Sequence, residues 1–136
     1  MRLDELIDFY QTLTPASLND FGDFYAEHAR FKDPFNDVRG LPAIRRIFSH
    51  MFTQVQEPRF VVSEKVGAGA TAFLVWTLHF RRGGKEETIH GVTRLQWDAS
   101  GKVIDHRDYW DAAEELYIKL PLLGGLMRAL RRRFAA

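Results

Sequence analysis

The fold is decided by the stretch from Gly101 to Asp111, GKVIDHRDYWD. A turn signal at Ser100 and Gly101 is followed by residues that alternate with a period of two, which is typical of a half-buried β-strand. One face of this strand carries Ile104, His106, Asp108 and Trp110, and the other carries Val103, Asp105, Arg107 and Tyr109. Either face buries ionisable groups when it turns inward, and buried charge is costly unless it is paired or used. The strand therefore predicts a structural ion cluster or a functional site.

Three more strands precede this one along the chain. The sequences GAGA, RGGK and DASG separate them and are typical of tight hairpin turns. The four predicted strands are Arg59 to Val66, Thr71 to Arg82, Glu86 to Trp97 and Lys102 to Trp110. Strands joined in this way predict an antiparallel meander.

The first part of the chain is predicted to be mainly helical. Apolar residues at helical spacing predict helices from Leu3 to Leu13, from Ser17 to Tyr25 and from Leu41 to Val55. A short strand is predicted from Ala29 to Phe35, followed by the loop NDVRG, because Pro34 restricts Asp33 to extended backbone. Helices followed by a meander predict an α+β fold in which a curved antiparallel sheet wraps around the helices and leaves a conical cavity.

Composition narrows the classes of function. The 136 residues suit one domain, and they include no cysteine, so a disulfide framework and a thiolate nucleophile are excluded. Residues 1–127 hold 15 basic and 18 acidic side chains, which argues against nucleic-acid binding. The histidines show no metal-ligand spacing and no dinucleotide or phosphate-loop motif is present, so we expect neither a metal nor a cofactor. The acidic N-terminal sequence is unlike a signal peptide, and we expect a cytoplasmic protein.

The end of the chain is predicted to be distinct from a domain that covers residues 1–120. After a short helix from Ala112 to Lys119, the tail of residues 121–136 is interrupted at Gly124-Gly125 and then forms a basic amphipathic helix. Its apolar stripe is Leu123, Leu126, Met127, Leu130 and Phe134, and the arginines are Arg128, Arg131, Arg132 and Arg133. Such a helix can lie on an anionic membrane surface. It can equally cover the wide end of the cone or a dimer neighbour, and we favour this second role.

The order of elements, together with the motifs FKDP and HRDYWD, resembles the nuclear transport factor 2-like superfamily. The similarity is greatest to its SnoaL-like branch, which includes ketosteroid isomerase, limonene epoxide hydrolase and polyketide cyclases, and it extends from residue 3 to about residue 118. The resemblance implies a cone-shaped α+β barrel, commonly a homodimer, with a pocket inside the cone.

Two aspartates carry the functional part of the resemblance. Asp33 falls where ketosteroid isomerase has its catalytic base, and Asp108 falls where limonene epoxide hydrolase has a catalytic aspartate. The partners that those reactions need are absent, since Phe9 stands near the position of the isomerase's oxyanion-stabilising tyrosine, with Tyr10 beside it, and Thr93 replaces its protonated aspartic acid. Neither named activity is therefore expected of this chain.

The resemblance also assigns the inward face of the last strand. It implies that the catalytic residues Asp33, Asp108 and His106 meet around a cavity lined by Tyr10, Phe31, Trp76, Leu78, Phe80, Thr93, Leu95 and Trp110. Two carboxyl groups among aromatic side chains can have different pKa values and so supply an acid and a base. In the alternative, His106 and Asp108 only hold the strand in place, and Asp33 is a turn residue before Pro34.

We therefore expect a protein with a small-molecule pocket that performs acid-base chemistry of an isomerase, cyclase or hydrolase type. Its substrate would be an apolar cyclic or polyketide-like molecule. The alternative is a non-catalytic ligand-binding or accessory domain. In either case we expect a homodimer formed through the outer face of the sheet, which carries His90 and Arg94.

Overall fold

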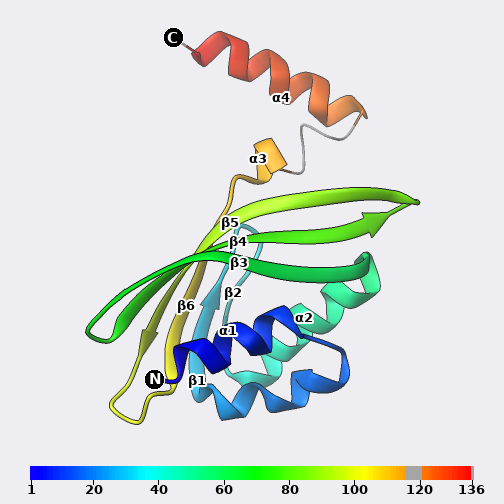
Figure 1. Cartoon of the computed structure of the whole chain (residues 1–136). Coiled ribbons are helices and arrows are strands. Elements are labelled where there is room, and N and C mark those ends of the chain that lie inside the picture. Colours follow the sequence, from blue (N-terminus) through cyan, green and yellow to red (C-terminus); the bar gives the residue numbers. More distant parts are fainter. Residues whose placement is uncertain (116–120, 136) are drawn as a thin grey trace.

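The computed structural model describes residues 1–115 and 121–135, in which helices cover one face of a six-stranded sheet (Figure 1). The helical elements are α1 (Leu3–Gln11), the 3-10 helix η1 (Ala16–Asp23), α2 (Leu41–Gln54), α3 (Ala112–Glu115) and α4 (Pro121–Phe134). The strands are β1 (Tyr25–Lys32), β2 (Asp37–Arg39), β3 (Gln56–Ala68), β4 (Thr71–Arg82), β5 (Lys85–Trp97) and β6 (Val103–Tyr109). The predicted α+β class and the predicted meander of the last four strands are confirmed.

The sheet is mixed and is not closed into a barrel. Its strand order is β2-β1-β6-β5-β4-β3, and β1 runs parallel to β6. The expectation of a wholly antiparallel sheet was wrong because α2 and the meander intervene between β1 and β6, and such a long crossover allows parallel pairing. Asp37 to Arg39 was expected to be loop but forms β2, which pairs with β1 and is held by two hydrogen bonds from Arg30 to Asp37.

The second predicted helix is a 3-10 helix that ends before Tyr25. Thr14 and Ser17 exchange side-chain-to-backbone hydrogen bonds at its start. At its end the carbonyl of Phe24 accepts a hydrogen bond from the backbone of Val103, and Tyr25 pairs with Val103 as the first residue of β1. Strand pairing across the domain therefore overrides the helical pattern of Phe24 and Tyr25.

A β-bulge changes the face of two residues in the last strand. Val103 pairs with Trp97 and Asp105 pairs with Gln96, so Ile104 is an extra residue between the two pairs. Val103 is consequently buried and Ile104 is 44% exposed, the reverse of the predicted arrangement. Beyond the bulge the predicted alternation holds, with His106 buried and Tyr109 exposed.

The core lies between the helices and the concave face of the sheet. Figure 1 shows α1 and α2 on the same side of the sheet. The largest fully buried side chains of the core come from both the helices and the sheet: Leu6, Phe21, Tyr25, Phe31, Ile44, Leu74, Leu95 and Val103. This packing places the inward residues of β4, β5 and β6 directly beneath the helices.

The C-terminal helix α4 stands apart from the sheet and the N-terminal helices (Figure 1). It begins at Pro121 and continues through Gly124-Gly125, where an interruption was predicted. Of the predicted helix from Ala112 to Lys119, residues 116–119 lie outside the described residues, as do the side chains of Leu123 and Met127. No helix among the described residues is long and apolar enough to cross a membrane.

Gly91 makes room for the indole ring of Trp76 on the neighbouring strand. The two residues are directly paired across β4 and β5, and a Cβ atom at Gly91 would lie 2.4 Å from the ring. We predict that Gly91→Ala lowers the free energy of unfolding by about 1–3 kcal/mol, because the ring must move out of a packed position. Chemical denaturation measures this change.

Gly67→Ala is the matched control for this substitution. Gly67 also lies in a strand, and its added Cβ would meet no atom closer than 3.5 Å. We expect a change below about 0.5 kcal/mol there. Equal effects of the two substitutions would contradict the close approach of Trp76 to Gly91.

Candidate functional site

A small cavity lies between the helices and the concave face of the sheet. Its wall is made of Tyr10, Phe48, Phe60, Val62, Leu74, Trp76, Thr93, His106 and Asp108. The free volume is about 20 Å³, enough for roughly one water molecule. Ligand pockets usually measure on the order of 300–1,000 Å³, so a ring-sized ligand would have to displace side chains of the wall. Phe60, which is only half-buried on the edge strand β3 and packs edge-on against Trp76, is the side chain best placed to move.

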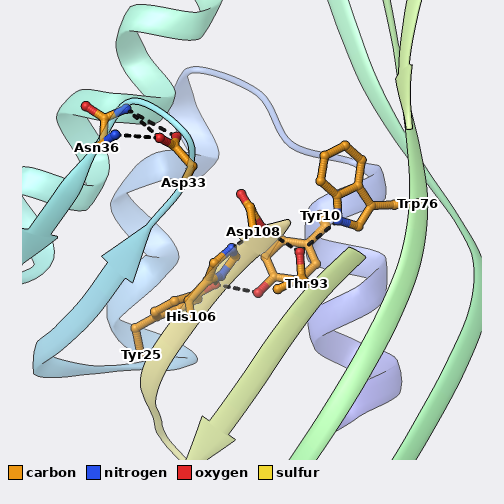
Figure 2. A network of polar contacts seen from close by, with 8 residues as sticks. All are labelled: Tyr10, Tyr25, Asp33, Asn36, Trp76, Thr93, His106 and Asp108. Carbon is orange, nitrogen blue, oxygen red and sulfur yellow. Dashed lines mark hydrogen bonds and ion pairs between the residues drawn. The ribbon is translucent and has the colours of Figure 1, made fainter. Parts of the chain in front are cut away.

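Polar side chains of the cavity form a continuous chain that meets at Asp108 (Figure 2). The indole nitrogen of Trp76 donates to Oγ1 of Thr93 at 2.7 Å, and that hydroxyl donates to Oδ1 of Asp108 at 2.5 Å. Nε2 of His106 lies 2.7 Å from the same Oδ1. No hydrogen bond to Oδ2 is found within the described part of the chain, and in Figure 2 this oxygen has no dashed line. One carboxylate oxygen is thus held from two sides, whereas the other has no hydrogen-bond partner among the described residues.

The chain continues from the other side of His106. Nδ1 of His106 lies 2.6 Å from the hydroxyl of Tyr25, which is bonded in turn to the hydroxyl of Tyr10. Burial raises the pKa of Tyr25 well above its ordinary value, and the adjacent Tyr10 raises it further. Burial likewise raises the pKa of Tyr10. Both phenols therefore keep their protons at neutral pH.

These contacts determine where the hydrogens lie when Asp108 is a carboxylate. A carboxylate only accepts, so Nε2 of His106 carries a hydrogen, and when the ring is neutral Nδ1 is an acceptor. Tyr25 must then donate to Nδ1, and Tyr10 must donate to Tyr25. Every hydrogen of the chain consequently points toward Asp108, and Tyr10, at the far end, gives its hydrogen to Tyr25 and not to the cavity.

Aromatic rings fix the orientation of the imidazole. Phe31 stacks on His106 with ring centroids 4.4 Å apart, and Tyr25 lies in a stacked orientation at 5.9 Å. The side chain of His106 is only 4% exposed. Packing therefore holds both ring nitrogens toward their partners, which is the arrangement expected of a preorganised site.

The structure places Asp33 in a turn. Its Oδ1 accepts hydrogen bonds from the backbone nitrogens of Phe35 and Asn36, and both of its oxygens accept from the side-chain amide of Asn36. Figure 2 shows this group on its own loop, without a bond to Asp108. Asp33 and Asp108 do line one shallow surface depression, but Asp33 is absent from the wall of the buried cavity. These contacts are those of the alternative in which Asp33 is a turn residue before Pro34.

The other predicted site residues divide between the cavity and its surroundings. Tyr10, Trp76, Thr93, His106 and Asp108 line the cavity. Phe31 is absent from the cavity wall but stacks on His106, which lines it. Leu78 and Leu95 belong to the core. Trp110 lines the surface depression, where its ring lies beside the exposed Phe35. Phe80 borders a separate hollow of about 820 Å³ at the ends of β3, β4 and β5. That hollow is wider, but its wall holds mainly partly exposed charged side chains and lies away from the chain that ends at Asp108.

Tyr25 was not predicted to be a site residue, because its sequence context predicted a helix. Within the described part of the chain its hydroxyl is bonded to Tyr10 and His106, and the second of these lies 81 positions later in the sequence. No local pattern identifies such a contact. Among the described residues, no group of three or more histidine or acidic side chains is placed to hold a metal ion.

Comparison with known families assigns the fold. Residues 6–106, most of the chain, match the SnoaL-like domain family. The chain belongs to this family. Comparison with curated proteins gives no match.

Three solved structures are similar to this SnoaL-like protein. A nuclear transport factor 2-like protein of unknown function from Burkholderia pseudomallei is 17% identical, with a TM-score of 0.72 over 82% of this chain and 92% of that chain. A candidate SnoaL-like polyketide cyclase from Jannaschia is 16% identical, with a TM-score of 0.71 over 82% and 84%. A protein with a ketosteroid isomerase-like fold from Catenulispora acidiphila, in complex with trimethylamine, is 13% identical, with a TM-score of 0.69 over 81% and 85%. At these identities the similarity shows the fold alone.

The direction of the hydrogen-bond chain is directly measurable. We predict that long-range proton-nitrogen NMR shows a hydrogen on Nε2 of His106 and none on Nδ1 at neutral pH. Tyr25→Phe should lower the free energy of unfolding by about 1–3 kcal/mol, because Nδ1 then loses its buried donor. Tyr109→Phe, on the exposed outer face, should change it by less than about 0.5 kcal/mol. A hydrogen found on Nδ1 in the wild-type protein would show that the chain runs the other way.

Proposed function

We propose that this SnoaL-like protein binds a small, largely apolar molecule in the cavity and moves a proton on it through Asp108. The observation that carries the proposal is the difference between the two oxygens of Asp108. Thr93 and His106 hold Oδ1, while Oδ2 is left to the ligand. A carboxylate held in one orientation next to an apolar wall is suited to act as a general base.

The same contacts indicate the chemistry of the ligand. Tyr10 and Asp108 both line the cavity, and in the inferred arrangement of hydrogens each offers it an acceptor rather than a donor. The ligand should therefore offer an acidic C–H or a hydroxyl group on an otherwise apolar ring. Tyr10 is not oriented to donate to a developing oxyanion, which separates the proposed reaction from that of a ketosteroid isomerase.

The second candidate function is ligand binding without a reaction. The observation in its favour is that Asp33, the second carboxylate expected of an acid-base pair, is held in its own turn and is absent from the cavity wall. A binding or accessory protein needs only that the wall opens. An enzyme needs in addition that Oδ2 of Asp108 reaches the reacting atom.

The test separates retention of the ligand from turnover. The ligand that co-purifies with the full-length protein is identified by mass spectrometry, then incubated with wild-type protein and with Asp108→Asn in deuterated water. We expect Asp108→Asn to retain the ligand and to lose product formation and deuterium incorporation by at least about 100-fold, the usual contribution of a general base.

Two controls accompany this substitution. Asp105→Asn lies on the outer face of the same strand, bonded to Arg94, and should leave turnover unchanged. Asp33→Asn alters the turn and should change stability rather than turnover. Undiminished turnover in Asp108→Asn would refute the catalytic proposal, and a retained but unchanged ligand in the wild-type protein would establish the binding function.

We also propose that the protein is a homodimer through the outer face of the sheet. Four apolar side chains on this face are exposed in the single chain: Val66, Phe73, Ile104 and Tyr109. Neighbouring strands bring them onto one surface, and such a surface is typical of an interface. Phe73→Lys should convert a dimer to a monomer in light scattering, whereas Ala99→Lys in the exposed turn before β6 should not. A wild-type protein that is already monomeric would refute this proposal.

A further inference from the structure

We propose that α4 attaches the protein to anionic membrane surfaces by lying in the plane of the lipid headgroups. The helix is amphipathic along its whole C-terminal half. Leu126, Leu130 and Phe134 follow one another at a spacing of four residues, which places them on one face. They are 54%, 41% and 81% exposed, so this apolar face is uncovered in the folded chain.

The charge of the helix is entirely positive. Arg131, Arg132 and Arg133 occupy its last turn, and Arg128 lies one turn earlier. The last acidic residue of the sequence is Glu115, so α4 has no acidic side chain of its own. Clusters of arginine beside an apolar face match the two parts of an anionic bilayer surface, which are charged headgroups above and acyl chains below.

The geometry favours a helix that lies on the membrane over one that crosses it. Fourteen residues span about 21 Å, shorter than the roughly 30 Å of hydrocarbon in a bilayer. Arg131 and Arg132 lie away from the apolar face at 100° per residue, and Arg133 borders it. The long apolar stem of Arg133 allows its charge to reach the headgroups while its carbon atoms stay in contact with the acyl region.

A second copy of the chain is a poorer fit for the same face. The outer face of the sheet holds exposed apolar side chains, and it also carries Arg107 and the ion pair between Arg94 and Asp105. The net charge of these three side chains is positive, so they do not complement an arginine-rich helix. The membrane surface, in contrast, complements both the charge and the apolar stripe of α4. The inference is independent of the proposed function at Asp108.

Vesicle binding of the full-length protein tests the proposal. We expect the protein to sediment with vesicles of phosphatidylcholine and phosphatidylglycerol, and to stay in solution with vesicles of phosphatidylcholine alone. Each arginine near an anionic surface contributes about a fivefold gain in binding, so the triple substitution Arg131→Gln, Arg132→Gln and Arg133→Gln should weaken binding on the order of 100-fold. Raising the salt concentration should have the same direction of effect.

A matched control separates the helix from the overall charge. Arg39→Gln, Arg46→Gln and Arg59→Gln remove three exposed arginines of the domain and give the same net charge, so they should leave binding within about threefold. Leu126→Ala, Leu130→Ala and Phe134→Ala should abolish binding while circular dichroism stays unchanged, because alanine preserves the helix.

Three outcomes would overturn the proposal. The first is a full-length protein that does not sediment with anionic vesicles. The second is an equal loss of binding in the two arginine triples, which would assign the binding to net charge. The third is that substitution of the apolar face of α4 changes the molecular mass in light scattering but leaves vesicle binding unchanged. That result would show that α4 packs against a second copy of the chain.

Discussion

The hydrogen bond between Tyr25 and His106 connects the two halves of this SnoaL-like domain. Tyr25 is the first residue of β1, and His106 lies in β6, the strand that pairs with β1 in parallel. The bond fixes one nitrogen of the imidazole, and the second nitrogen then points to Asp108. The position of the carboxylate thus depends on the junction between the helical N-terminal part and the meander.

Burial makes this arrangement specific. A phenol, an imidazole and a threonine hydroxyl that are removed from water are stable only when each donor has an acceptor. The chain from Tyr10 to Asp108 and the second branch from Trp76 meet this requirement with one direction of hydrogen bonding. With this direction of bonding, Tyr10 and Asp108 act as acceptors toward a ligand, which restricts the ligands and the reactions that we propose.

The cavity and the C-terminal helix represent two different uses of apolar side chains. Around the cavity, Phe60 and Trp76 pack until almost no free volume remains. On α4, Leu126 and Phe134 face outward next to arginines. The first arrangement contributes to the stability of the domain, whereas the second leaves apolar side chains exposed.

Much of the fold was predictable from local pattern. The hairpin turns, the period-two strands and the helix from Leu41 carry their signals within a few residues, and the structure confirms them. The motif HRDYWD likewise indicated that His106 and Asp108 share an inward face. The pairing of β1 with β6 and the assignment of Phe24 and Tyr25 to the sheet had no such local signal, because they depend on hydrogen bonds to Val103.

The sequence by itself determined which residue types would share one face of the last strand, since alternation places His106 and Asp108 together whatever their neighbours are. Only the tertiary structure decided what they bond to. The bulge at Ile104 set the register of the strand, Tyr25 supplied the partner of Nδ1, and Asp33 was held by its own turn instead of joining Asp108. The reason is physical: side-chain direction follows from local backbone geometry, whereas hydrogen-bond partners in a core depend on which distant strands are paired.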